Sequence, residues 1–341
     1  MKTIYGFSEI KTNILDSFIT EKLHHCNLIN GIKGVGKASF IYNEIIPFIL
    51  SETNSISKKN IASSIIDRTI KLIESGGHPD LLVLDINTID EDGKENTSKK
   101  GEINVNQTRK IINNIKLTPS ISKNKVLIID SIDNLNINAQ NALLKTLEEP
   151  PQNTFLFLIC HNLNKVLTTI KSRSNIINCQ QLSIEDWGSA LFSNEEIQEI
   201  EIEDEELADL YNISNASVNF AMNILQNNAL NLYDRILEVL LDKNIVKIQQ
   251  FANDFVEQEK FDLMCIFFET ILMDILNYNN TKNNNTFIEK RKNIFDLIKK
   301  RNEINKFLQY YDYFHNTIND VNIYNLDKKQ AINVIINNIK L

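Results

Sequence analysis

The chain has 341 residues, of which 43% are hydrophobic, and a formal net charge of −8. It is long enough to bury two or three separate cores, and its acidic balance argues against a protein whose main task is to grip nucleic-acid phosphates, because that task needs clustered Lys and Arg. The longest apolar runs fall far short of the roughly 18 residues of a membrane span, and the N-terminal residues carry no secretory signal, so we expect a cytoplasmic protein with no membrane partner.

The first half of the chain alternates short apolar runs with helix-length amphipathic segments. This alternation predicts an α/β fold in which a parallel sheet is covered by helices on both faces. The runs expected to form strands are 27–29, 81–84, 126–129 and 155–159.

The second half has a different composition. All prolines lie at or before Pro151, and no glycine follows Gly188. Apolar residues recur there at three- and four-residue intervals, as in 232–241 and 261–276, which predicts successive helices. We therefore expect a core at 1–182, a small helical lid at 183–227 and a helical domain at 228–341. The polar segment 277–285 (NYNNTKNNN) is expected to be a flexible loop.

A glycine-rich segment, 31–39 (GIKGVGKAS), lies between the run 27–29 and a helical pattern that ends near Leu50. Strand, glycine loop and helix in this order form a phosphate-binding loop. Backbone N–H groups would contact the phosphates, and the lysine would reach the terminal ones. The alternative is a glycine turn that binds nothing. The nucleotide-binding residues predicted here are Gly31, Gly34, Val35, Gly36 and Lys37.

Two positions have lost groups that a working ATPase needs. The residue after the lysine should carry a hydroxyl for Mg²⁺, but it is Ala38, and Ser39 lies roughly 100° further around the helix. Asp130, at the end of the run 126–129, is the predicted Walker B acid, or alternatively a cap of the following turn. The next residue would usually be Glu but is Ser131, which cannot act as a base near neutral pH, and Asp133 is too far along the chain to replace it.

The string 141–151 (NALLKTLEEPP), preceded by 126–133 and followed by 155–174, closely resembles the AAA+ clamp-loader subunits of bacterial DNA polymerase III, above all those of the delta-prime type. The segments 78–81 (HPDL) and 103–109 (INVNQTR) are also similar to that family. The resemblance covers about residues 20 to 180 well, and the remainder only through its helical layout. It implies an AAA+ P-loop core with a five-stranded parallel sheet, followed by a lid and an all-α C-terminal collar.

The resemblance also implies roles for particular residues. Ser172-Arg173-Ser174 corresponds to a Ser-Arg-Cys motif whose arginine reaches the ATP of a neighbouring subunit, so Arg173 is the predicted catalytic residue in trans. The alternative is an ordinary solvated arginine. In the lid, Asn219 takes the place of a nucleotide-sensing arginine. Many relatives carry a four-cysteine zinc module after the first helix, but 50–76 contains no cysteine, so we predict no metal and no zinc.

These features support two main hypotheses. The first is a clamp-loader subunit that holds ATP or ADP without turnover, assembles with gamma/tau- and delta-type subunits, offers Arg173 to a neighbour and helps to load a sliding clamp on primer-template DNA. The second is an active AAA+ ATPase, either a gamma/tau-like clamp-loader subunit or a remodelling motor, that uses Lys37 and Asp130 on its own ATP. A P-loop scaffold outside replication would require the match at 141–151 to be accidental. The basic stretches 290–292 and 299–301 are expected to be a solvated helical face rather than a contact with DNA or an acidic partner.

Overall fold

The computed structural model describes residues 4–53, 61–88, 102–194, 196–197, 200, 202–242, 244–278, 291–292, 294–296 and 304–338. The chain divides into two compact units: residues 1–195 with 217–219 form the first, and residues 196–216 with 220–341 form the second. The finer division into 1–182, 183–227 and 228–341 stays a prediction.

The first unit is built on a five-stranded parallel sheet with the strand order β2-β3-β4-β1-β5. Four of the strands contain the four apolar runs predicted from the sequence, which confirms them. The short edge strand β5 has only two apolar residues and three of its four residues are exposed, so its pattern is weak. The bounds are β1 Cys26–Asn30, β2 Leu81–Asp85, β3 Lys125–Asp130, β4 Thr154–Cys160 and β5 Asn175–Asn178.

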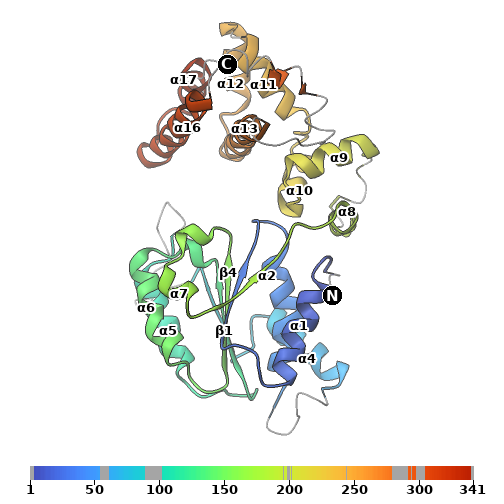
Figure 1. Cartoon of the computed structure of the whole chain (residues 1–341), viewed down its shortest axis with the longest axis vertical. Helices are drawn as coiled ribbons and strands as arrows, with labels where there is room; N and C mark the ends of the chain where they lie inside the picture. The colour runs from blue at the N-terminus through green and yellow to red at the C-terminus, as the bar shows by residue number, and fades with distance from the viewer. Residues whose placement is uncertain are drawn as a thin grey trace. The chain divides into compact units, whose positions relative to one another are not determined.

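Helices cover both faces of this sheet, as Figure 1 shows. On one face lie α5 (Val105–Ile115), α6 (Ile137–Glu148) and α7 (Thr168–Lys171), and on the other lie α1 (Ser8–Ile19), α2 (Lys37–Phe40) and α4 (Ser63–Glu74). Leu127, Ile129 and Leu158 of the central strands are fully buried in the core beneath α5 and α6. The α/β arrangement expected from the sequence is therefore confirmed.

The helix that follows the glycine loop runs to Leu50 as predicted, but it is not a regular α-helix. A π turn, Ile41–Ile45, separates α2 from α3 (Ile46–Leu50). Pro47 has no N–H to donate to the carbonyl one turn earlier, and a widened turn accommodates that loss.

In the described residues beyond 183, every regular element is helical, as predicted. Helix α8 (Ile184–Phe192) belongs to the first unit. The second unit packs around aromatic side chains such as Phe268 and Phe314, whose stacked rings lie 5.1 Å apart. Its helices are α9 (Asp204–Ile213), α10 (Val218–Gln226, of which residues 218–219 belong to the first unit), α11 (Leu232–Asp242), α12 (Ile245–Asp254), α13 (Gln258–Tyr278), α16 (Ile304–Tyr324) and α17 (Lys328–Asn338).

None of the helices that the structure describes is long and apolar enough to cross a membrane. The predicted flexible loop, 277–285, lies outside the described residues apart from its first two positions.

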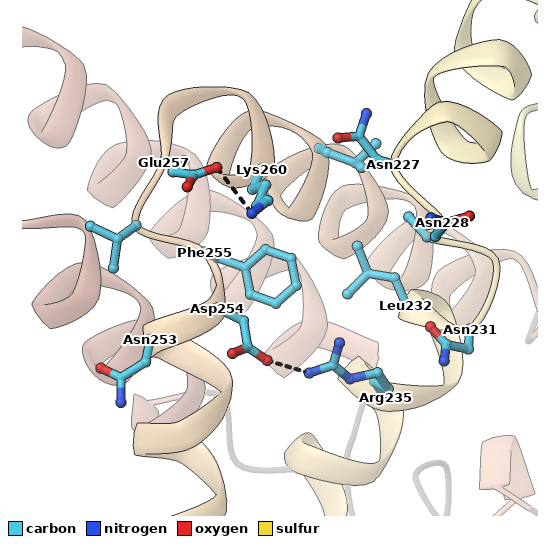
Figure 2. Close-up of a pocket in the computed structure, with 13 residues that line it drawn as sticks. Asn227, Asn228, Asn231, Leu232, Arg235, Asn253, Asp254, Phe255, Glu257 and Lys260 are labelled. Carbon is cyan, nitrogen blue, oxygen red and sulfur yellow. Dashed lines mark hydrogen bonds and ion pairs between the residues drawn. The ribbon is translucent and has the colours of Figure 1, made fainter.

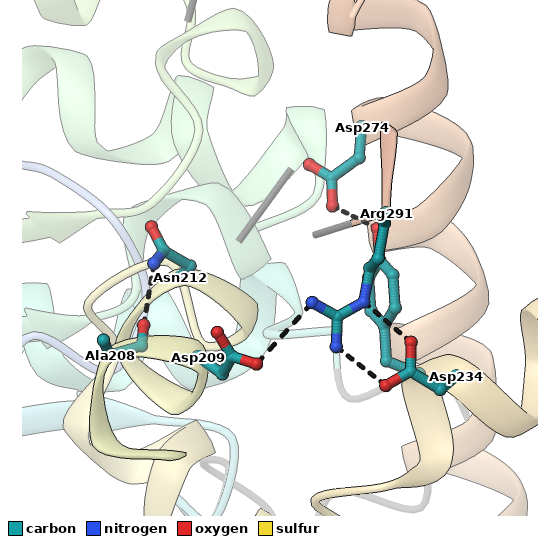
Figure 3. A network of polar contacts seen from close by, with 7 residues as sticks. Ala208, Asp209, Asn212, Asp234, Asp274 and Arg291 are labelled. Atoms are coloured by element: carbon teal, nitrogen blue, oxygen red, sulfur yellow. Dashed lines mark hydrogen bonds and ion pairs between the residues drawn. The ribbon is translucent and has the colours of Figure 1, made fainter. Parts of the chain in front are cut away.

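The expectation of a solvated basic face at 290–292 was wrong for Arg291, which is 8% exposed. Figure 3 shows its guanidinium between two carboxylates. Nε and Nη2 each donate to Asp234 over 2.7 Å, and Nη1 lies 3.6 Å from Asp209. Paired carboxylates allow a guanidinium to leave water, and a count of basic residues along the sequence does not reveal them. Residues 290 and 299–301 lie outside the described part of the chain.

Candidate nucleotide site

The glycine loop joins the carboxyl end of β1 to the start of α2, in the position that phosphate binding requires. Gly34 and Gly36 have φ angles of +85° and +93°, a left-handed conformation that side-chain-bearing residues rarely adopt. Gly36 is also the residue that precedes the first turn of α2. A glycine loop with the predicted position and backbone conformation is therefore present, and its binding of phosphate stays a prediction.

Lys37 is turned inward and only 2% exposed. Its ammonium group donates to the carbonyl oxygens of Gly31 and Ile32 over 2.7 and 2.6 Å, and to Nδ1 of His161 over 2.9 Å. A lysine ammonium has three hydrogens to donate. All three are used within the chain, so no donor of Lys37 remains for a phosphate in this conformation.

His161 reaches the loop because of the strand order. Strands β1 and β4 are neighbours, with Asn30 opposite Cys160, and the carboxyl ends of parallel strands meet at one edge of the sheet. The backbone N–H of His161 donates to Oδ1 of Asp133 over 2.9 Å, which fixes the residue where it leaves β4. His161 was not among the residues predicted from the sequence. The only sign of its role there is its place shortly after the predicted strand 155–159.

The electrostatics agree with this hydrogen-bond pattern. Burial lowers the pKa of Lys37 to about 8, an effect that nearby Cys179, Cys160, Asp133 and Asp130 partly oppose. Burial and, to a smaller extent, the charge of Lys37 together lower the pKa of His161 to about 4, although Asp133 opposes them. At neutral pH the imidazole is therefore an uncharged acceptor, and Lys37 is mostly a charged donor.

Asp130 closes β3 directly opposite Asp85 of β2. Burial raises the pKa of Asp130, and the neighbouring Asp85 raises it further, while Lys37 opposes the shift. Asp85 was not singled out from the sequence, because its partner strand lies 45 residues further along the chain.

The positions of the missing groups fit their expected lack of function. Ser131 is 2% exposed, and its hydroxyl has no hydrogen-bond partner among the described residues. Ala38 has no hydroxyl and Ser39 is exposed to solvent.

Arg173 lies just after α7, and its hydrogen-bond and ion-pair partners differ from those of Lys37. Its side chain is 37% exposed. Nη1 donates to the carbonyl oxygen of Thr169 over 3.0 Å, and Nη2 lies 2.7 Å from Oε1 of Glu148, the last residue of α6. The guanidinium is therefore anchored at the surface and not freely solvated.

Asn219, the predicted replacement of a sensing arginine, belongs to the segment 217–219 of the first unit. Its backbone N–H donates to the carbonyl oxygen of Gly34 over 3.3 Å. The neutral amide of this side chain supplies no positive charge for a phosphate.

The second unit contains a pocket of about 400 Å³ at the end of α12, shown in Figure 2. Its two cations are paired: Arg235 lies 2.7 Å from Asp254, and Lys260 lies 3.0 Å from Glu257.

Within the described ranges, no group of three or more His, Cys, Asp or Glu side chains could hold a metal ion. The loop 31–37 and Arg173 therefore remain the candidate sites.

Comparison with known proteins gives consistent matches. The family described as "DNA polymerase III, delta subunit" matches residues 7–183, more than half of the chain. DNA polymerase III subunit gamma of Buchnera aphidicola is 30% identical over 78% of this chain and 69% of its own length. DNA polymerase III subunit delta' of Pseudomonas aeruginosa is 37% identical, but over 31% of this chain and 29% of its own.

Among solved structures, a DNA polymerase III gamma subunit-related protein from Thermotoga maritima aligns with 96% of this chain and 98% of its own, with 15% identity and a TM-score of 0.41. The family assignment depends on the sequence matches and not on this alignment.

Proposed function

The chain belongs to the DNA polymerase III delta subunit family of clamp-loader proteins, and on that premise we propose that it is a delta-prime-type subunit that hydrolyses no ATP itself. In this proposal it completes a ring with gamma/tau- and delta-type subunits in the cytoplasm. It offers Arg173 to the ATP of a neighbour and helps to place a sliding clamp on primer-template DNA.

The observation that carries this proposal is the state of Lys37. All three of its donors are satisfied by Gly31, Ile32 and His161, so the loop lacks the free ammonium on which phosphate charge would be stabilised. Ala38 and Ser131 remove the Mg²⁺ ligand and the base. Each loss alone impairs hydrolysis, and together they favour a subunit without turnover that at most holds ATP or ADP.

The position of Arg173 supports its proposed role at the ATP of a neighbouring subunit. A trans-acting arginine must lie at the surface of its own subunit, and this side chain is 37% exposed on the turn after α7. Its planar guanidinium stays charged at any physiological pH and can donate two parallel hydrogen bonds to phosphate oxygens.

Specific observations also support one alternative function. Gly34, Gly36, Lys37 and Asp130 are all present, and the gamma subunit of Buchnera aphidicola matches 78% of the chain. These observations favour an active gamma/tau-like ATPase, in which Lys37 would turn outward when ATP binds.

Two measurements on the full chain test the proposal. Purified alone, the chain should show no ATP hydrolysis above that of a Lys37→Ala control, and co-expressed with gamma/tau, delta and clamp subunits it should copurify with them. Robust hydrolysis by the isolated chain would favour the gamma/tau-like alternative. Failure to copurify with any of these subunits would contradict the assembly role.

A further inference from the structure

The contact between Lys37 and His161 joins two elements that are 124 residues apart in the chain. It is not a by-product of loose packing. Lys37 is almost fully buried, and His161 is fixed at its own backbone by Asp133 over 2.9 Å. The imidazole nitrogen therefore stands at a defined place at the edge of the sheet, within hydrogen-bonding distance of the lysine that would bind phosphate.

The other two partners of Lys37 belong to the loop itself. The carbonyl oxygens of Gly31 and Ile32 lie at the start of the loop, so any lysine folded back over it could use them. His161 is the partner that the loop cannot supply. Without it, one donor of the ammonium would be unsatisfied in a buried position, which costs free energy and favours the outward conformation.

We propose that His161 is a positioning residue that keeps Lys37 folded into its own loop, so that phosphate groups of ATP or ADP find no ammonium to bind. This inference rests on the proposed function, since it concerns the same loop. It explains why Lys37 would not bind phosphate, which the substitutions at Ala38 and Ser131 do not explain. Those two changes remove groups for Mg²⁺ and water, whereas His161 acts on nucleotide binding.

The uncharged state of the imidazole is consistent with this role. Two cations in contact would repel each other, and the low pKa of His161 keeps its Nδ1 available as an acceptor for Lys37. Asp130, Asp133, Cys160, Cys179 and Lys33 are the other titratable groups that act on the pair.

The test measures binding of a fluorescent ATP analogue, and of ATP by calorimetry, to the full chain and its variants. His161→Ala should bind at least about 10-fold more tightly than the wild type, the gain expected when one hydrogen bond to a charged group no longer competes. His24→Ala is the matched control. It removes the same side chain just before β1, at the opposite end of that strand from the loop. It should bind like the wild type.

Two further variants keep the proposal falsifiable. His161→Leu, which keeps a side chain of similar size but has no acceptor for the ammonium of Lys37, should show the same gain if His161→Ala does not fold. The double variant His161→Ala/Lys37→Ala should lose the gain, because the freed ammonium is its source. Unchanged affinity in a folded His161 variant would overturn the inference, as would a gain that persists without Lys37.

These outcomes separate the inference from the proposed function. Tighter binding without hydrolysis supports both. Tighter binding with hydrolysis by the variant would support the role of His161 and contradict the argument that Ala38 and Ser131 by themselves prevent turnover. Unchanged binding would remove the role of His161 and leave the proposed function standing.

Discussion

Arg173 and Glu148 form an ion pair in which Nη2 lies 2.7 Å from Oε1. The arginine that we propose for a neighbour's ATP is thus held by the last residue of α6, within the string 141–151 that carries the family resemblance. The two side chains are 37% and 51% exposed, and such a pair contributes at most about 1 kcal/mol. A phosphate group with more charge can therefore displace the carboxylate at small cost.

Replacing Arg173 by alanine should slow ATP hydrolysis in the assembled complex without preventing assembly. Loss of an arginine finger costs on the order of 10³-fold in rate or more, because the charge developing on the phosphoryl group loses its stabilising cation. Steady-state hydrolysis by the complex, with size-exclusion chromatography to confirm assembly, provides the measurement. Glu148→Gln is the control, since it leaves the arginine in place and should retain the rate. Equal rates for the Arg173→Ala and wild-type complexes would refute the trans role.

Asp80 should be a main stabiliser of the first unit. Its fully buried carboxylate accepts the backbone N–H groups of Ser120, Ile121 and Ser122 over 2.5, 2.9 and 2.8 Å. Asp80→Ala removes the acceptor of three backbone donors, of which that of Ser122 is buried and the other two are partly buried, and should lower the free energy of unfolding by about 3 kcal/mol. Urea denaturation and faster hydrogen exchange at residues 120–122 would report it. Asp67→Ala, on the exposed surface of α4, should change the stability by less than about 0.5 kcal/mol.

Two arginine–aspartate pairs of the second unit offer a direct test of burial. Arg291 is 8% exposed and binds Asp234 through two hydrogen bonds, whereas the side chains of Arg235 and Asp254 are 42% and 55% exposed. Arg291→Ala should cost about 3 kcal/mol or more, because it removes a buried guanidinium together with its two hydrogen bonds to Asp234. Arg235→Ala should cost about 1 kcal/mol or less. Similar losses in thermal unfolding for the two variants would contradict this reading of the network in Figure 3.

Asp274 should make the stability of the second unit depend on pH. Burial raises its pKa from 3.8 to about 6, although the hydrogen bond from Tyr233 and the charge of Arg291 oppose the shift. A raised pKa means that the folded state binds the proton more tightly. The resulting stability is fully present below about pH 3.8 and is lost as the pH rises through about 6.

Asp274→Asn, which keeps an oxygen acceptor for the Tyr233 hydroxyl, should therefore be more stable than the wild type at pH 7, by up to about 3 kcal/mol. The difference should shrink toward zero near pH 4. Urea denaturation at both pH values measures it, and a difference that is independent of pH would show that folding does not shift the pKa of Asp274.

The fold of the first unit followed from local sequence patterns because its central strands are buried on both faces. The runs 126–129 and 155–159 are continuous apolar segments, as central parallel strands require. The edge strand β5, with Asn175 and Asn178 at its ends, has no such signal, since one of its sides meets solvent. The π turn before Pro47 was not predicted either, because the sequence shows that a helical hydrogen bond is missing but not how the backbone adapts.

For the candidate site, the sequence by itself determined which chemical groups are present: the glycines and Lys37 of a phosphate loop, the losses at Ala38 and Ser131, and a surface arginine in a family motif. Only the tertiary structure decided what these groups contact. The strand order places His161 beside Lys37 and Asp85 beside Asp130, and α6 brings Glu148 to Arg173. Side-chain spacing within one segment is fixed by local geometry, whereas contacts between segments depend on which strands become neighbours in the sheet. The packing of the whole unit determines which strands are neighbours.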